Sequence, residues 1–223
     1  MDAWPLSLLV ISLSFACGSI PFAWITTKAV RGVDLRTVGS GNVGATNAAR
    51  VLGRQWFLFV FILDALKGAL PLLLFPALAN LGTTGSVRLG MACGLAAILG
   101  HVFCPWLGWK GGKGVATGAG VLGALAPLPS LVALVAFLAM LRWSRYVSLA
   151  SCAACVVLGP AAFAFRADSE VAVFCIVVGA LVIWLHRPNL ARIAAGTEPQ
   201  VFKKRPTAAG EPQDLKKEVP PHA

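Results

Sequence analysis

The chain has 223 residues, of which 57% are hydrophobic and 13% are charged, and its net charge is +10. Because soluble domains are about 25% charged, this composition excludes an ordinary soluble protein and indicates an integral membrane protein. It also excludes a basic nucleic-acid-binding protein, which would not contain long apolar segments. The positive charge is instead typical of a cytoplasmic membrane face and of binding to anionic ligands or membrane lipid.

Five apolar segments are long enough to cross a hydrocarbon core of about 30 Å as single helices. In chain order they are Trp4–Thr27, Trp56–Leu78, Ser86–Phe103, Tyr146–Phe165 and Glu170–Leu185. Between the third and the fourth lies Gly114–Leu141, which is also apolar but contains Pro127 and Pro129 near its middle. The pattern predicts an all-α, polytopic integral membrane protein.

The prolines in Gly114–Leu141 decide the topology. A single helix there would place the basic C-terminal tail opposite the basic loop Lys28–Arg54, against the positive-inside rule. Two short helices, Gly114–Ala126 and Pro129–Leu141, remove this conflict. Each would be about 20 Å long and too short to span alone, which is tolerated where the broken backbone is buried in protein. We therefore expect seven helices, with the N-terminus outside and the C-terminus in the cytoplasm.

The domain organisation follows from composition. Residues 1–196 are expected to form the membrane domain, and residues 197–223, which are rich in Pro, Lys and Glu, a disordered cytoplasmic tail. The topology places three polar segments on one face: Lys28–Arg54, Cys104–Lys113 and His186–Thr197. This convergence is the main indication of function.

The first polar segment contains the sequence SGNVGATNAAR, whose residue types suit an anion. Its glycines leave backbone N–H groups uncovered, which can form an anion-binding nest, and short polar side chains and an arginine add donors. The residues are Gly39, Ser40, Gly41, Asn42, Gly44, Thr46, Asn47 and Arg50. A helix that starts near Ala45 would add its own N-terminal N–H groups. The alternative is a flexible loop followed by a capped helix.

The second polar segment interleaves two lysines with three glycines ahead of a helix expected to begin near Val115. These residues are Lys110, Gly111, Gly112, Lys113 and Gly114. The composition suits a phosphate, although the spacing does not match a Walker A loop. His101, just upstream, could be either structural or functional.

The third polar segment, HRPNLARIAAGTEP, contains His186, Asn189, Arg192 and Glu198. By itself it could be a membrane exit with basic anchors. On the same face as the other two segments, it becomes a candidate polar lid over an anion site.

Two groups of residues inside the apolar segments are ambiguous. Asp64 and Lys67 are spaced i, i+3, and ionisable side chains within a span are costly and often functional; a structural ion pair is the alternative. The six cysteines are interpreted as small packing residues, because no second pair or His cluster completes a metal site around Cys152 and Cys155. We therefore expect no metal and no cofactor.

Five motifs occur in the order GSIPFAW, SGNVGATNAAR, LDALKG, GHVFCPWLGWKGGKGVAT and HRPNLARIAAGTE. From about Gly18 to Glu198 the chain resembles the bacterial acyl-phosphate-dependent glycerol-3-phosphate acyltransferase family, with Cys104 as an insertion between Phe and Pro. The resemblance implies acyl transfer from acyl phosphate to the sn-1 hydroxyl of glycerol 3-phosphate. The products are lysophosphatidic acid and phosphate, in the first step of phospholipid biosynthesis. A membrane transporter of a phosphorylated solute and a non-enzymatic lipid-binding protein are the alternatives.

The resemblance also implies roles for individual residues. His186, Ser40 and Asn189 would position the reacting groups. The proton acceptor would be the acyl phosphate itself, with His186 or His101 as second choice and Asp64 as third. By the same resemblance Arg50, Lys110 and Lys113 would bind substrate. The residue types of the three polar segments and their flanks add Gly41, Asn42, Gly44, Thr46, Asn47, His101, Gly111, Gly112, Arg192 and Glu198 to the predicted substrate-binding set. The enzyme would lie in the bacterial cytoplasmic (inner) membrane with its active site on the cytoplasmic face, coupled functionally to an acyl-phosphate-forming enzyme.

Overall fold

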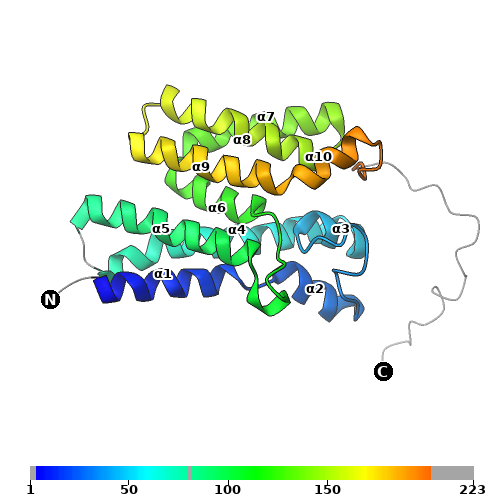
Figure 1. The fold of residues 1–223 in the computed structure, drawn as a ribbon, viewed down its shortest axis with the longest axis horizontal. Coiled ribbons are helices and arrows are strands. Elements are labelled where there is room, and N and C mark those ends of the chain that lie inside the picture. The colour runs from blue at the N-terminus through cyan, green and yellow to red at the C-terminus, as the bar shows by residue number, and fades with distance from the viewer. Residues whose placement is uncertain (1–3, 80–81, 202–223) are drawn as a thin grey trace, which may run out of the picture.

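The structure is a computed structural model that describes residues 4–79 and 82–201. Within these residues the chain is entirely helical (Figure 1). The elements are α1 (Trp4–Gly18), α2 (Phe22–Arg31), α3 (Ala45–Leu52), α4 (Gln55–Ala79), α5 (Gly82–Val102), the 3-10 turn η1 (Pro105–Leu107), α6 (Val115–Leu125), α7 (Pro127–Ser144), α8 (Val147–Ala164), α9 (Ser169–Leu185) and α10 (Arg187–Ala194). The all-α prediction is confirmed.

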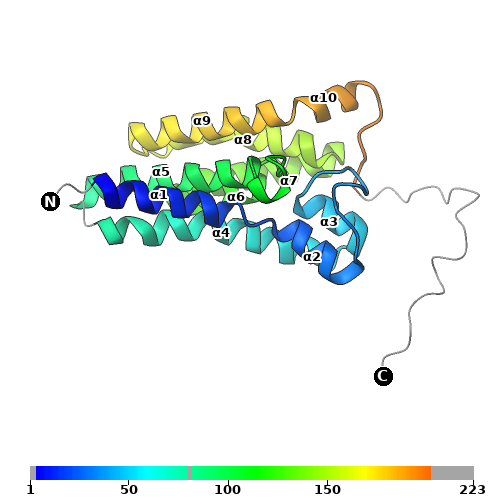
Figure 2. The ribbon, with the colours of Figure 1, turned by 60° about the horizontal axis from the view of Figure 1, so that its bottom comes forward.

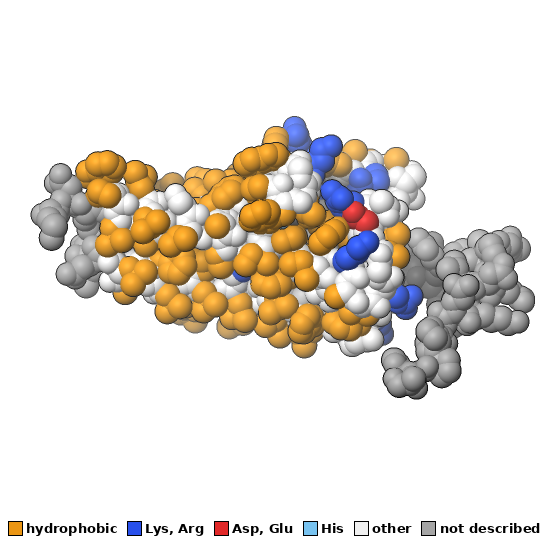
Figure 3. All heavy atoms as spheres, turned by 90° about the horizontal axis from the view of Figure 1, so that it is seen from below, with side chains coloured by type: hydrophobic (Ala, Val, Ile, Leu, Met, Phe, Trp, Pro, Cys, Tyr) orange, Lys and Arg blue, Asp and Glu red, His pale blue; other side chains and the backbone are white. Residues whose placement is uncertain are grey.

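The long helices have the length and composition of membrane spans. Five segments qualify, the first of which contains both α1 and α2, and α9 with α10, bent by 50° where they meet, form a sixth candidate. Large apolar side chains are exposed along these helices, and they cover most of the face drawn in Figure 3. Apolar side chains exposed on all sides of a helical bundle are expected where lipid is the solvent, so the chain is a multi-pass membrane protein.

The helices pack in two groups joined by α6. Helices α1, α4 and α5 contact one another and α4 packs along α6, whereas α7, α8 and α9 form the second group. Glycine allows the closest approach between α4 and α6: a Cβ on Gly120 would lie 1.9 Å from the Ala65 carbonyl oxygen. Small residues at such contacts are typical of membrane helices, because they let the backbones approach closely.

Two helix boundaries differ from the sequence prediction. The first span is interrupted at residues 19–21, because Pro21 has no N–H to continue the ladder of α1. The second half of the proline-broken segment is not short: α7 starts at Pro127 and has 18 residues, enough to cross a membrane. Proline is tolerated in the first turn of a helix, where its missing N–H costs nothing. The prediction that this half is too short to span is therefore wrong.

The number of helices also differs from the seven expected. Helices α2, α3 and α10 were not counted, since their sequences were assigned to a span or to polar loops. In contrast, α3 begins at Ala45 and α6 at Val115, as predicted, and α6 is short, with 11 residues.

The polar segments lie together at one end of the bundle. Helices α2, α3 and α10 and the loops beside them gather at the right of Figures 1 and 2, whereas α1 starts at the opposite end. In Figure 3, Lys and Arg side chains gather at the same end. We call it the polar end. The predicted convergence of the three segments is thus a property of the fold.

Candidate active site

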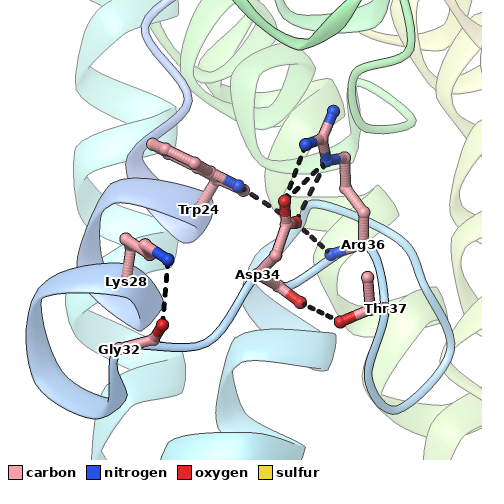
Figure 4. A network of polar contacts seen from close by, with 6 residues as sticks. All are labelled: Trp24, Lys28, Gly32, Asp34, Arg36 and Thr37. Carbon is pink, nitrogen blue, oxygen red and sulfur yellow. Dashed lines mark hydrogen bonds and ion pairs between the residues drawn. The ribbon is translucent and has the colours of Figure 1, made fainter.

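The first polar segment is held in shape by Asp34, a residue that the sequence did not single out. Its Oδ1 accepts hydrogen bonds from Trp24 Nε1 at 3.1 Å and from the Arg36 backbone N–H at 2.9 Å, and its Oδ2 lies 2.6 Å from Arg36 Nη2 (Figure 4). These bonds, those from Arg36 first, hold the pKa of Asp34 well below its usual value. An aspartate two residues before its backbone donor is an Asx turn, and this local spacing could have identified it.

Asn47 closes the loop from the other side. The buried side chain accepts a hydrogen bond from the Ser40 backbone N–H at 2.8 Å and donates to the carbonyls of Leu35 and Val38 at 3.2 and 3.1 Å. Gly39 has a φ of +64°, and a Cβ there would lie 2.2 Å from Asn47 Oδ1. The amide of Asn47, predicted to bind substrate, is therefore directed at the loop backbone and sets the shape of the Ser40 turn.

The other predicted residues of this segment differ in exposure. Ser40 and Gly41 are exposed at the turn, and Asn42, Gly44 and Thr46 are half-buried. Arg50 is exposed on α3, and its Nη2 donates a 3.3 Å hydrogen bond to the carbonyl of Pro199, which is 149 residues away in sequence. The first polar segment therefore contacts the end of the third one.

The second and third segments are joined by a chain of polar contacts. Lys113 Nζ donates to Asn189 Oδ1, and Asn189 Nδ2 donates to Glu198 Oε1 at 2.6 Å. Glu198 is also bound by Ser148 Oγ at 3.0 Å and by Arg192 Nε at 2.8 Å. Four residues predicted from the sequence thus form one network. Ser148 was missed, because nothing in an apolar helix start marks a serine whose partner lies 50 residues away.

The network extends to residues after α10. Thr197 N–H bonds to the Arg192 carbonyl at 2.8 Å, and Val201 N–H bonds to the Arg145 carbonyl at 2.8 Å. Residues 197–201 are thus held against the body of the protein by hydrogen bonds. The disordered tail was predicted for residues 197–223, and residues 202–223 of it lie outside the described part of the chain. The domain boundary at 196 stays a prediction.

The electrostatics of this network favour an anion. The pKa of Lys113 is lowered to about 8, chiefly by burial and also by the charges of Arg192 and Arg50, against the opposing charge of Glu198. Burial by itself raises the pKa of Glu198, but hydrogen bonds from Asn189, Arg192 and Ser148 outweigh it and bring the pKa below its usual value. Three cations therefore act around one carboxylate, and an added anion would reduce their mutual repulsion.

His186 lies at the bend between α9 and α10. It is buried, and its Nδ1 lies 2.7 Å from the Val182 carbonyl oxygen, which can only accept, so in the neutral ring the proton is on Nδ1. The charges of Lys113 and Glu198 both act on it. The ring nitrogen Nε2 is then left as an acceptor, beside the Lys113–Asn189–Glu198 network.

A second polar cluster lies deeper in the bundle. Lys67 Nζ is 2.7 Å from Asp64 Oδ1, both side chains are 2% exposed, and His101 Nδ1 lies 3.8 Å from the same oxygen. The predicted ion pair is confirmed. Gly111 and Gly112 pack on His101, since their N–H groups bond to the carbonyls of Val102 and His101.

Not every predicted binding residue joins the Lys113–Asn189–Glu198 network. His101, Gly111 and Gly112 contact the deeper cluster instead, and Lys110 is exposed at the polar end. In the described residues, no three His, Cys, Asp or Glu side chains come together as a metal site.

Comparisons with known proteins agree on one family. The model of the family "Glycerol-3-phosphate acyltransferase" matches residues 8–196. A glycerol-3-phosphate acyltransferase of Myxococcus xanthus (strain DK1622) is 45% identical over 190 residues, which are 85% of this chain and 96% of the relative. One of Methylorubrum extorquens (strain PA1) is 41% identical over 201 residues, with 90% and 96% covered.

Two solved structures are also similar. The crystal structure of PlsY (YgiH), an integral membrane glycerol 3-phosphate acyltransferase, in its glycerol 3-phosphate form has a TM-score of 0.79 at 39% identity, over 87% of this chain and 95% of that one. Its lysophosphatidic acid form has a TM-score of 0.77 at 38% identity, over 87% and 94%. By its motifs, its fold and these comparisons, the chain belongs to the glycerol-3-phosphate acyltransferase family of membrane acyltransferases.

Proposed function

We propose that this enzyme transfers a fatty acyl group from an acyl phosphate to the sn-1 hydroxyl of glycerol 3-phosphate, at the cytoplasmic face of the bacterial inner membrane. The observation that carries the proposal is the link from Lys113 through Asn189 to Glu198, with Arg50 bound to Pro199. It joins three distant segments around an excess of cations. The related PlsY structures contain glycerol 3-phosphate in one form and lysophosphatidic acid in the other, which are a substrate and a product of this reaction.

The charge of the site supports a donor with a phosphate head. Both glycerol 3-phosphate and acyl phosphate are phosphate anions, so a site for the pair needs two groups of donors. We assign Arg50 to glycerol 3-phosphate, because a guanidinium binds phosphate bidentately. We assign Lys113 to the donor phosphate, since an ammonium acts as a compact point charge. The N-terminus of α3, which begins at Ala45 without a side-chain cap, offers backbone N–H groups to either anion.

The reaction needs no covalent enzyme intermediate. The sn-1 oxygen attacks the acyl carbonyl carbon, a tetrahedral intermediate forms, and the bond from that carbon to the phosphate oxygen breaks. The hydroxyl proton leaves with the phosphate, whose second pKa of about 6 makes it an adequate acceptor. Nε2 of His186 is suited to accept a hydrogen bond from the hydroxyl and orient it. Asp64 and His101 are disfavoured as bases, because their side chains are only 2% and 6% exposed and belong to the deeper cluster.

A comparison of donors tests the proposal. The purified protein in lipid nanodiscs is given labelled glycerol 3-phosphate and one of palmitoyl phosphate, palmitoyl-CoA or palmitoyl-acyl carrier protein. We expect lysophosphatidic acid, with one phosphate released per product, from palmitoyl phosphate alone. Arg50→Gln should raise the KM for glycerol 3-phosphate, whereas Arg88→Gln, at the opposite end of the bundle, should not. Product formed from a thioester donor would overturn the assignment of the donor.

The orientation is tested separately by labelling engineered cysteines. Lys110→Cys at the polar end and Asp168→Cys at the opposite end are each treated with a membrane-impermeant maleimide. We expect Asp168→Cys to react in intact cells and Lys110→Cys to react only after the inner membrane is opened. The reverse pattern would place the site outside the cytoplasm, where a donor made by a cytoplasmic acyl-phosphate-forming enzyme could not reach it.

A further inference from the structure

The deeper cluster contains ionisable groups that the proposed reaction does not use. Lys67 Nζ is 2.7 Å from Asp64 Oδ1, and the same nitrogen donates a 2.7 Å hydrogen bond to the carbonyl of Ile20. Ile20 lies in the break between α1 and α2, where its carbonyl cannot continue a helical ladder. Lys67 also lies 5.6 Å from the centre of the Phe22 ring at the start of α2. One side chain on α4 therefore holds the break between α1 and α2, and α2 leads from there into the first polar segment.

The same cluster contacts the second polar segment through His101. A Cβ on Gly112 would lie 2.1 Å from His101 Nε2, and one on Gly111 would lie 1.9 Å from the His101 carbonyl oxygen. The loop therefore passes directly over the histidine, one residue before Lys113. The other ring nitrogen, Nδ1, faces Asp64 at 3.8 Å.

A small cavity lies where these parts meet. Its volume is about 10 Å³, close to what one water molecule needs, and its walls include Ser19, Lys67, His101, Gly111 and Gly112. The break in the first span, the ion pair on α4 and the glycine loop thus share one polar centre beneath the active site.

Stability alone is a weak reason to bury such a pair. The cost of removing two charges from water is large, and replacing a buried ion pair by apolar side chains of similar size is often neutral or stabilising. Apart from the ion-pair contact of Oδ1 with Lys67, neither carboxylate oxygen of Asp64 has a hydrogen-bond partner among the described residues. The buried ion pair is therefore better explained by the orientation of the Ile20 break and the Gly111–Gly112 loop than by a gain in folding stability.

We propose that Asp64, Lys67 and His101 are positioning residues, which hold the Ile20 break and the Gly111–Gly112 loop in register so that the donor-binding ammonium of Lys113 meets Asn189. This inference rests on the proposed role of Lys113 in binding the donor phosphate. Lys67 holds the Ile20 carbonyl, and Asp64 lies beside the ring of His101. His101 in turn fixes the position of the Gly111–Gly112 loop by direct contact.

The decisive variant removes the pair without leaving a lone charge. Asp64→Leu/Lys67→Met keeps the volume of both side chains, and its control, Arg88→Gln/Glu170→Gln, neutralises the exposed pair between α5 and α9. We expect the first variant to fold, with a KM for palmitoyl phosphate raised between about tenfold and a hundredfold, since a displacement of about 1 Å in a positioning group can cost that much. The control should retain the wild-type KM.

A structural role gives a different signature. If the pair only stabilises the fold, the apolar variant either keeps wild-type kinetics or loses Vmax in proportion to lost folded protein, at an unchanged KM. Either result would overturn the inference. Failure of the wild type itself to use palmitoyl phosphate would instead overturn the proposed function.

A second variant keeps the inference testable if the apolar pair does not fold. Gly112→Ala leaves the ion pair intact but forces a Cβ against His101, so the donor KM should rise similarly. Because that clash needs the ring, the same change in a His101→Ala background should cost at most about a third as much. If Gly112→Ala raises the donor KM equally in the two backgrounds, the contact between Gly112 and the His101 ring does not position Lys113.

Discussion

The charge of Lys113 should limit the reaction at alkaline pH. The pKa of this ammonium is lowered to about 8, first by burial and then by the charges of Arg192 and Arg50. Because only the protonated form attracts a phosphate, binding of the donor should weaken as pH rises through that value. The matched variant is Lys113→Arg, since a guanidinium keeps its charge to above about pH 12.

The size of the effect follows from the titration. With a pKa of about 8, Lys113 is about 90% protonated at pH 7 and about 10% protonated at pH 9. The value of kcat/KM for the donor reports the free enzyme, so it should fall about tenfold between these pH values. The arginine variant should be slower at pH 7, because its larger head does not reproduce the contact with Asn189. Over the same range, however, its kcat/KM should change less than about twofold.

The assay measures initial rates of labelled lysophosphatidic acid formation in nanodiscs, at palmitoyl phosphate concentrations below its KM and saturating glycerol 3-phosphate. Parallel samples without enzyme correct for hydrolysis of the donor. The reasoning is refuted if the wild type shows no decline up to pH 9. It is equally refuted if Lys113→Arg declines at the same pH as the wild type, since another group must then titrate.

Two further predictions concern the contacts that hold the site together. Asn47→Ala removes one acceptor and two donors from backbone groups, so it should cost about 2–4 kcal/mol and lower the melting temperature by about 4–16 °C. Asn47→Asp keeps the acceptor but turns a carboxylate oxygen toward the Leu35 and Val38 carbonyls, so it should lose at least as much, and near-wild-type stability would show that the two donated bonds do not matter. Glu198→Gln removes the carboxylate that raises the pKa of Lys113, so the alkaline decline in kcat/KM should begin at a lower pH than in the wild type; an unchanged pH profile would mean that the two charges do not interact.

Much of this architecture could be predicted because it depends on local sequence. The apolar segments follow from composition, and the glycines before Ala45 and Val115 mark helix starts. The pairing of Asp64 with Lys67 follows from their i, i+3 spacing. The gathering of three polar segments at one end follows from topology, once the positive charges are required to share a face.

The remaining features depend on tertiary contacts or on ambiguous local signals. Ser148 donates a hydrogen bond to Glu198, which is 50 residues away in sequence. No local sequence pattern near either residue predicts this contact. Prolines at 127 and 129 could equally interrupt a helix or begin one, and α7 uses them to begin. Pro21, in contrast, does interrupt a span, which was predicted to be continuous. Asp34 is the exception, because its turn is local and could have been found.

The charge balance of the site links these contacts to the proposed chemistry. A site with cations alone would bind two phosphates tightly. However, the neighbouring positive charges would favour loss of the proton from Lys113, and the site would release the phosphate product slowly. Glu198 moderates both effects: it opposes the loss of a proton from Lys113, and it binds Arg192 and Asn189 directly. The incoming donor phosphate then supplies the missing negative charge and should raise the pKa of Lys113 as it binds. The phosphate that leaves carries the hydroxyl proton as HPO4²⁻, so it has the same charge as the donor head group, and the trianion, which the cations would hold most tightly, does not form.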